Sequence, residues 1–598
     1  MSRPQIRSSQ LITTFGPGAM VDLPDDAIII AGIESWRYHR GQPLPTIVES
    51  RLQAKVGALL GVPDIGFRKP PAAVEDRGFT PDIAGYRFPE WLIVQNVVET
   101  GRGRRARRLV HLNDLDRGKY RDIDGKRYPV VPVRFVRACR RGHVGDIDWH
   151  AFVHGAEHEP VDCRRELVIE ERGTSGDLDS IWIRCACGKE RPMSQAARMD
   201  LGALGRCNGS RPWLGPGTRE ACGEPNRLLI RSASNAYFPQ LLSVISIPDV
   251  MDEVNRTVEA LWESHLSAVE REDELKILMK TSIVKQQLEG IPVEKVMAAI
   301  QQKHRGGDVD ERPVKEVEFE ALSQAKEELG ADEPNGDFYA RSLPHDAWTS
   351  PWLSCLQRVV LVHRLREIVA QLGFTRFEAA VPDIQGELDM QVQRAPIGLD
   401  ISWVPAIENR GEGIFLEFKA NAIRAWLDKE AVKRRDAELQ AGFGLWQQDH
   451  QGSNRQYPGV PFYMLHSLSH LLLMAVSLEC GYPASSLRER VYAAPECYGI
   501  LIYTGSSDAE GTLGGLVEEG RRIRQHLRRA LDMGSLCSND PVCAFHRPRL
   551  HDHQPLLGSA CHGCLLISET SCEQHNDFLD RSLVVSTVEG LGVQFFED

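Results

Sequence analysis

The spacing of 14 cysteines constrains this 598-residue chain more than any other feature of its sequence. The first residues lack the apolar core of a signal peptide, so we expect a cytoplasmic protein, where reducing conditions disfavour disulfides. The sequence contains no run of about 18 apolar residues, so we predict no transmembrane helix. The cysteines are therefore expected to bind metal ions or to pack as small core residues.

A C-terminal group of cysteines has the spacing of a metal site. Its members are Cys537, Cys543, Cys561, Cys564 and Cys572. The Cys561-x2-Cys564 turn places two thiolates on one side of a tight loop, where they fill two corners of a tetrahedron, and a more distant pair fills the others. Five candidates for four positions leave one spare. We predict a closed, structural zinc site, with buried free thiols or a redox pair as the alternatives.

An N-terminal group offers ligands for one or two further sites. Its members are Cys139, His143, Cys163, Cys185, Cys187, Cys207 and Cys222. The Cys185-x-Cys187 pair, followed by a glycine, resembles a zinc-ribbon knuckle, and we expect Cys207 and Cys222 to complete its site. Cys139 and Cys163 remain for a second site, completed by His143 or His154. The two groups together predict one to three structural Zn²⁺ ions per chain.

The net charge of −12 conceals two blocks of opposite sign. Residues 101–141 carry a local charge of +10, and residues 249–341 carry −10. The densest basic run contains Arg102, Arg104, Arg105, Arg107 and Arg108. Because guanidinium groups pair with phosphate oxygens, this run is a candidate DNA contact, and a solvated hairpin tip is the alternative.

A second basic stretch lies near the C-terminus. It contains Arg521, Arg522, Arg524 and Arg528 within a predicted amphipathic helix over 515–531. These arginines are either a DNA contact or a solvated helix face.

The patterns along the chain predict an α+β, multi-domain protein. We divide it into a mixed β-rich region (1–135), a zinc-ribbon-like module (136–248), an acidic helical block (249–345) and a C-terminal zinc-binding domain (346–598). Within the last, apolar spacing predicts a buried helix over 352–372 and an apolar helix over 461–479. Strands are expected over 377–404, 413–419 and 498–503.

The sequence offers little for catalysis. It contains no Gly-x4-Gly-Lys-Ser/Thr loop and so predicts no nucleotide-driven motor. His466 and His470 share one helix face, but Ser467 stands where a metalloprotease helix has its glutamate. We interpret the two residues as hydrogen-bonded core histidines and assign no catalytic residue.

A metal-dependent nuclease is the alternative enzyme class. Asp383 follows a proline, and Glu417-x-Lys419 occurs 34 residues later. Nucleases of the PD-ExK type hold Mg²⁺ with such carboxylates and use the lysine beside the attacking water. This interpretation requires Asp383, Glu417 and Lys419 to converge.

Several short motifs occur together along nearly the whole chain. They lie at 11–19, 137–143, 211–215, 233–239, 411–416, 466–470, 510–515, 537–543, 560–564, 569–573 and 579–581. In combination they resemble the DrmB family, the non-helicase component of the DISARM anti-phage system. The C-terminal part is similar to the zinc-binding domain of MrfA-type repair helicases.

The resemblance implies a non-catalytic subunit that partners a DrmA-like superfamily 2 helicase and helps it to translocate on or sense phage DNA, including ends with single-stranded overhangs. It implies Cys543, Cys561, Cys564 and Cys572 as zinc ligands, with Cys537 as competitor. An assembly scaffold without DNA contact is the second alternative. We expect the acidic helical block to contact the helicase or to pack away from DNA, because its charge repels phosphate.

Overall fold

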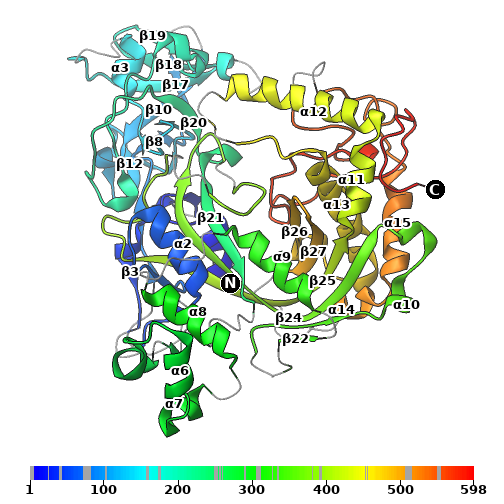
Figure 1. Ribbon diagram of the computed structural model, residues 1–598. Helices are drawn as coiled ribbons and strands as arrows, with labels where there is room; N and C mark the ends of the chain where they lie inside the picture. Colours follow the sequence, from blue (N-terminus) through cyan, green and yellow to red (C-terminus); the bar gives the residue numbers. More distant parts are fainter. Residues whose placement is uncertain are drawn as a thin grey trace.

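The computed structural model describes most of residues 6–597. The residues it leaves undescribed are 1–5, 24–25, 40–42, 72–81, 101–103, 156–160, 173–176, 248–253, 255–256, 259, 289–290, 305–311, 326–327, 331, 333–335, 380–381, 389–392, 451–452, 454, 506–514, 549–553 and 598. Small N-terminal sheets lie on one side and C-terminal helices on the other, and two long strands, β24 (Leu356–Thr375) and β25 (Trp403–Phe418), cross between them (Figure 1).

The long strands form the centre of a nine-stranded sheet. They pair antiparallel from Leu356↔Phe418 to Ala370↔Ala406. The order is β22-β23-β24-β25-β27-β26, with β21 also on β24, and β5 pairing with both β25 and β4. The added strands are β21 (Phe238–Ile245), β22 (Glu328–Gly330), β23 (Tyr339–Ser342), β26 (Leu487–Ala494), β27 (Cys497–Thr504), β4 (Thr46–Ile47) and β5 (Gly66–Arg68).

Two predictions for this sheet were wrong. Residues 352–372 are not a helix but mostly strand β24, whose side chains from Leu365 to Thr375 are all buried. A strand covered on both faces shows a continuous apolar run without alternation, which resembles a buried helix. The described residues between β24 and β25 (376–379, 382–388 and 393–402) include no strand, and the Asp383 carboxylate there accepts the backbone N–H groups of Gln385 and Glu387.

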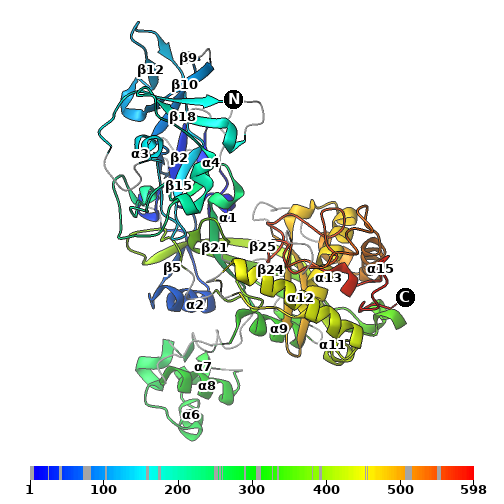
Figure 2. The ribbon, with the colours of Figure 1, turned by 90° about the horizontal axis from the view of Figure 1, so that it is seen from above.

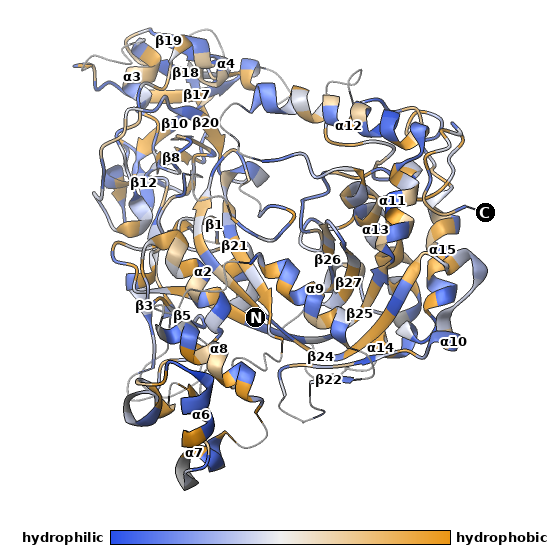
Figure 3. Cartoon of the chain, in the orientation of Figure 1, coloured by the Kyte–Doolittle hydropathy of each residue, from blue (hydrophilic) through white to orange (hydrophobic). Residues whose placement is uncertain are grey.

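Helices cover the C-terminal part of the sheet. They are α10 (His345–Trp348), α11 (Ala420–Leu427), α12 (Glu430–Asp449), α13 (Val460–Cys480), α14 (Gly515–Gly520) and α15 (Ile523–Gly534). The helix over 461–479 and the strands over 413–419 and 498–503 are confirmed, whereas 515–531 forms two helices instead of one. Both α12 and α15 carry hydrophobic and hydrophilic residues (Figure 3).

Helix α13 is the centre of the largest apolar core. Its apolar side chains pack with residues from β25, β27, α15 and the C-terminal loops. Among the described residues it is the one helix long and apolar enough to cross a membrane, and 83% of its apolar window is buried inside the protein. That burial is typical of a core helix.

The N-terminal part contains a seven-stranded sheet in the order β14-β8-β10-β17-β18-β19, with β9 also on β10. Its strands are β8 (Trp91–Val94), β9 (Val98–Thr100), β10 (Arg104–His111), β14 (Val130–Pro132), β17 (Leu167–Glu171), β18 (Ile181–Cys185) and β19 (Glu190–Pro192). One face packs on α3 (Trp149–His154) and α4 (Ser194–Ala197) around a separate core.

Smaller sheets and helices complete this part. The sheets are β1 (Met20–Asp22) with β2 (Ala27–Ile30) and β7 (Gly85–Arg87); β3 (Trp36–Arg37) with β6 (Asp82–Ile83); β11 (Leu115–Asp116) with β12 (Lys119–Arg121) and β13 (Arg127–Tyr128); and β15 (Phe135–Ala138) with β16 (Val144–Gly145) and β20 (Arg227–Ile230). The helices are α1 (Ser8–Thr13) and α2 (Ser50–Leu60).

The acidic block contains a helical lobe and an element of the main body. Helices α6 (Glu272–Leu278), α7 (Ser282–Gln287) and α8 (Val293–His304) share a core of their own, and Figure 2 shows them standing apart. Helix α9 (Val314–Gln324) instead packs on the nine-stranded sheet, where the ring of Phe319 meets Phe415 and Tyr492. The fold is thus the predicted mixed α+β type, built on several sheets.

Candidate metal centres

Cysteine, histidine and glutamate side chains meet in four tetrads within the described part of the chain. In each, the candidate ligand atoms lie within 4.8 Å of one another. We call them the first N-terminal tetrad (Cys139, His143, Cys207, Cys222), the second N-terminal tetrad (His154, Cys163, Cys185, Cys187), the C-terminal tetrad (Cys537, Cys543, Cys561, Cys564) and the buried tetrad (His466, His470, Glu489, Cys572).

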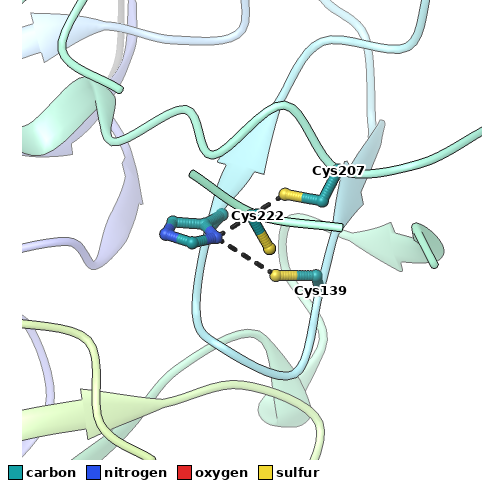
Figure 4. Close-up of side chains that lie close together, drawn as sticks. Cys139, Cys207 and Cys222 are labelled. Carbon is teal, nitrogen blue, oxygen red and sulfur yellow. Dashed lines mark hydrogen bonds between the residues drawn. The ribbon is translucent and has the colours of Figure 1, made fainter. Parts of the chain in front are cut away.

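The first N-terminal tetrad begins at the turn after β15. Gly142, with φ +82°, closes this turn and its N–H donates to the carbonyl of Cys139. His143 Nδ1 then lies 3.4 Å from Cys139 Sγ and 3.6 Å from Cys207 Sγ (Figure 4). With Cys222 beside them, three sulfurs and one imidazole nitrogen form the Cys₃His set of a closed structural zinc site.

The histidine of this tetrad is held by a carboxylate. His143 Nε2 lies 2.7 Å from Glu220 Oε1, and Glu220 also accepts from Arg141 and Arg211 at 3.0 and 3.1 Å. A carboxylate only accepts here, so Nε2 carries the hydrogen and Nδ1 presents its lone pair to the sulfurs. Ligating histidines in metal sites are oriented by partners of this kind.

A hydrogen bond between Cys139 and Cys207 shifts the pKa values of these two thiols in opposite directions. A hydrogen bond from the Cys139 thiol lowers the pKa of Cys207 to about 4, and the same bond, with burial, raises the pKa of Cys139. Metal binding must displace the proton of the Cys139 thiol, so zinc affinity here is expected to fall with acidification.

The second N-terminal tetrad joins α3 to the end of β18. His154 Nδ1 donates to the carbonyl of His150 at 2.8 Å, which leaves Nε2 facing Cys187 Sγ at 3.2 Å. Cys163 Sγ and Cys185 Sγ are 3.6 Å apart. The predicted knuckle is present, because Gly188 at φ +100° donates its N–H to the carbonyl of Cys185.

The structure combines the N-terminal ligands differently from the sequence-based expectation. Cys207 and Cys222 lie with Cys139, and the knuckle pair lies with Cys163 and His154. Strand pairing is the reason: the register of β17 with β18 sets Leu167 opposite Cys185, which brings the segment after Cys163 to the knuckle. Sequence spacing alone therefore does not predict which of these ligands share a tetrad.

The C-terminal tetrad consists of four sulfurs. Cys537 and Cys561 are 3.4 Å apart, Cys543 and Cys564 3.7 Å, and Cys561 and Cys564 3.8 Å. Four thiolates at about 2.3 Å from Zn²⁺ lie about 3.8 Å from one another, whereas a disulfide needs about 2.05 Å. The backbone N–H of Gly563 donates to Cys561 Sγ, as expected for a thiolate ligand.

Cys572 is the spare cysteine of the C-terminal group. The ligand set implied by the family resemblance contained it in place of Cys537, but the structure places Cys537 in the tetrad. Cys572 lies instead with His466, His470 and Glu489 in the buried tetrad. Sequence analysis missed this group, although the unassigned His466-x3-His470 pair was its signal.

The first basic run lies largely on β10. Arg102 falls outside the described residues, and of Arg104 only the strand position is described. Arg107 pairs with Glu171 at 3.2 Å, and Arg108 pairs with Glu166 at 3.6 Å. Acidic side chains thus partly neutralise this run.

The second basic stretch is an exposed face formed by the turn between α14 and α15 and by α15 itself. Arg521, Arg522, Arg524 and Arg528 are all exposed, while Ile523 and Leu527 are buried. Glu518 and Glu519 pair with the first two arginines, and the guanidinium of Arg528 lies over the ring of Trp352 at 4.6 Å.

The nuclease candidates have separate partners. Asp383 accepts N–H groups of its own loop, Glu417 pairs with Arg358 at 3.3 Å, and Lys419 Nζ donates to the carbonyl of Ser354. None of the four tetrads found among the described residues includes Asp383 or Glu417.

Comparisons with known families agree with the metal geometry. Residues 468–565 match the "MrfA Zn-binding domain", a range that contains all four cysteines of the C-terminal tetrad. Residues 7–238, which contain both N-terminal tetrads, match a "Domain of unknown function (DUF8724)". The chain is therefore a zinc-binding-domain protein with an N-terminal region of a family without assigned function.

A full-length relative identifies the family. The chain is 30% identical to the DISARM protein DrmB of Bacillus paralicheniformis, over 96% of this chain and 100% of that protein. It belongs to the DrmB family and is a component of DISARM defence.

Proposed function

We propose that this chain is a non-motor, non-catalytic subunit that holds DNA beside a DrmA-like superfamily 2 helicase in the cytoplasm. Membership of the DrmB family supports the defence context. The sequence has no phosphate-binding loop, which supports a division of labour in which another chain hydrolyses ATP.

The observation that carries the DNA contact is the arginine face of α15 and of the turn that precedes it. Arg521 and Arg522 in the turn and Arg524 and Arg528 on α15 are exposed, whereas Ile523 and Leu527 of the same helix are buried. Such a face presents guanidinium groups on a rigid element, as phosphate binding requires. Arg524 and Arg528 are the core of the proposed contact.

The run on β10 is the weaker candidate. Arg107 and Arg108 are half-buried and pair with acidic residues, whereas all four arginines of the other face are exposed, although two of them also have acidic partners. Among the arginines of this run whose burial is described, Arg105 is the exposed one. We propose that β10 contributes at most a secondary contact.

Zinc ions in the two N-terminal tetrads and the C-terminal tetrad would rigidify both ends of the body. Each ligand set comprises four protein side chains, which leaves no open position for a catalytic water. The residues fit structural sites, and a structural Zn²⁺ contributes on the order of 10 kcal/mol coupled to folding. The loops around α15 and the β-rich region would then be fixed relative to bound DNA.

The helical lobe of α6–α8 is the proposed helicase contact. It has its own core and stands apart from the main body (Figure 2), and it lies within the acidic block. The lobe itself, residues 272–304, carries five acidic and five basic side chains, so the proposed contact rests on its separation from the main body and not on its charge.

DNA binding by the purified chain tests the proposal. Affinity for a duplex with a single-stranded overhang should fall steeply with salt. Replacing all four arginines of the face by alanine should weaken binding and reduce the log–log salt slope by about 0.9 for each phosphate that the protein no longer neutralises. A matched control removes four exposed arginines elsewhere, Arg198, Arg271, Arg312 and Arg424. Equal weakening in both variants would contradict a specific arginine face.

A further inference from the structure

The buried tetrad joins three separate segments in the interior. His466 and His470 come from α13, Glu489 from β26, and Cys572 from the C-terminal loop. The histidines are 0% exposed, Glu489 is 1% exposed and Cys572 is 6% exposed. The MrfA Zn-binding domain match begins at residue 468 and ends at 565, so it contains neither His466 nor Cys572.

In both histidines the ring hydrogen lies on Nδ1, which points away from the centre of the tetrad. His470 Nδ1 lies 2.8 Å from the carbonyl oxygen of Leu565, and His466 Nδ1 lies 3.3 Å from that of Phe578. A carbonyl oxygen only accepts, so each Nδ1 carries the hydrogen. Each Nε2 of a neutral ring therefore presents a lone pair to the centre of the tetrad.

The Nε2 lone pairs of both histidines face a carboxylate oxygen, which is also an acceptor. His466 Nε2 and His470 Nε2 lie 2.8 and 3.2 Å from the same carboxylate oxygen, Glu489 Oε1. The other oxygen, Glu489 Oε2, accepts from the Ser469 hydroxyl. Three electron-rich atoms of buried side chains thus face one another, and only added protons or a bound cation makes this arrangement favourable.

Backbone N–H groups surround the sulfur of Cys572 as they would a thiolate ligand. Cys572 Sγ accepts the backbone N–H groups of Gln574 at 3.4 Å and Asn576 at 3.2 Å, in a tight turn where His575 and Asn576 have positive φ. The same sulfur lies 3.1 Å from His466 Nε2. The C-terminal tetrad holds its sulfurs through backbone N–H groups in the same way.

We propose that the buried tetrad is a fourth zinc site, with Zn²⁺ bound by His466 Nε2, His470 Nε2, Glu489 Oε1 and Cys572 Sγ. Nitrogen, oxygen and sulfur donors in fourfold coordination are those that zinc accepts. One dication with two neutral imidazoles, one carboxylate and one thiolate gives zero net charge, which burial requires. The Nδ1 contacts to backbone carbonyls supply the outer hydrogen bonds typical of zinc-bound histidines.

The ion would fix one wall of a cavity of about 350 Å³. Glu489 and Cys572 line this cavity, and so does the neighbouring Glu573, which pairs with Lys315 at 2.7 Å. The backbone N–H of Glu489 also donates to the carbonyl of Ser571. The four protein ligands make the site structural: it attaches the C-terminal loop to helix α13 and strand β26.

Metal content measured per chain tests the proposal. Wild-type protein, purified without added metal or chelator, should contain one zinc more than Cys572→Ser or His470→Gln. Cys497→Ser, which alters a half-buried cysteine outside every tetrad, is the matched control and should leave the content unchanged. Equal zinc content in folded wild type and Cys572→Ser would overturn the proposal.

A variant-free measurement covers the case in which these substitutions prevent folding. Anomalous scattering at the zinc absorption edge from wild-type crystals should give a peak among the four ligand atoms of the buried tetrad. Ordered side chains without a peak would mean that protons, not a metal, balance the cluster, and would overturn the proposal. A peak from another metal would overturn the assignment to zinc.

Discussion

His143 Nε2 lies 2.7 Å from Glu220 Oε1, on the side of the ring opposite to the sulfurs of Cys139 and Cys207. This hydrogen bond selects the tautomer that can bind metal through Nδ1. It also connects the first N-terminal tetrad to Arg141 and Arg211, so that the charge of the site is balanced by the protein around it.

The glutamate partner of His143 predicts an effect on metal affinity that does not require removal of a ligand. Glu220→Gln should lower the zinc affinity of the first N-terminal tetrad by 10- to 100-fold, because the ring loses its orienting carboxylate. Competition with a chromophoric chelator measures this. Glu224→Gln, a nearby change at a side chain outside the tetrads, should leave affinity unchanged, and similar affinities for both variants would contradict the role of Glu220.

The C-terminal tetrad predicts that metal content and stability fall together. Cys561→Ser should remove one zinc per chain and lower the melting temperature, because the ion's binding free energy is also folding free energy. Metal analysis with a thermal melt checks both. Zinc content equal to that of the wild type would exclude Cys561 as a ligand.

The knuckle predicts pH-dependent thiol reactivity when metal is withdrawn. The backbone N–H of Lys189 holds the pKa of the exposed Cys187 down at about 6, whereas burial raises the pKa of Cys355 to about 11. Because a thiol is an acid, Cys187 is mostly thiolate above pH 6 and becomes protonated, and so unreactive, below it.

Alkylation followed by peptide mass spectrometry measures this difference. In chelator-treated protein, iodoacetamide at pH 7 should modify Cys187 well before Cys355, and the rate at Cys187 should decline below pH 6. Added zinc should protect Cys187. Equal rates at the two cysteines would contradict the assigned pKa shifts.

A buried ion pair predicts a large decrease in stability on substitution. Arg435 Nε on α12 lies 2.8 Å from Asp580 Oδ2, and the side chains are 2% and 0% exposed. Arg435→Met would leave the Asp580 carboxylate buried without its partner, which costs about 3–5 kcal/mol. Urea denaturation measures this, with Arg198→Met as control, because the pair of Arg198 with Asp200 is exposed to solvent and therefore screened. A change no larger than in the control would contradict the structural role of the pair.

Sequence spacing predicted which cysteines take part in metal sites better than how they combine. The short turns, Cys139-x3-His143, Cys185-x-Cys187 and Cys561-x2-Cys564, are local and readable from the chain. The other ligands of each tetrad are placed beside these turns by strand register and loop packing, as the pairing of Leu167 with Cys185 shows. The buried tetrad was missed because its three segments lie up to 106 residues apart.

The main error in the fold has a related cause. Strand β24 is buried on both faces over much of its length, so its apolar residues do not alternate and their spacing fits a helix equally well. Helix α13 was predictable because it is long and apolar and ends at Gly481, whose φ of +72° terminates the helix.

We propose that this chain itself contacts DNA in the helicase complex. Crosslinking the assembled complex to photoreactive overhang DNA, followed by mass spectrometry of the labelled peptides, tests it most directly. We expect crosslinks to peptides of this chain that contain Arg521, Arg524 and Arg528. Labelling confined to the helicase chain would contradict it and would favour an assembly scaffold without DNA contact.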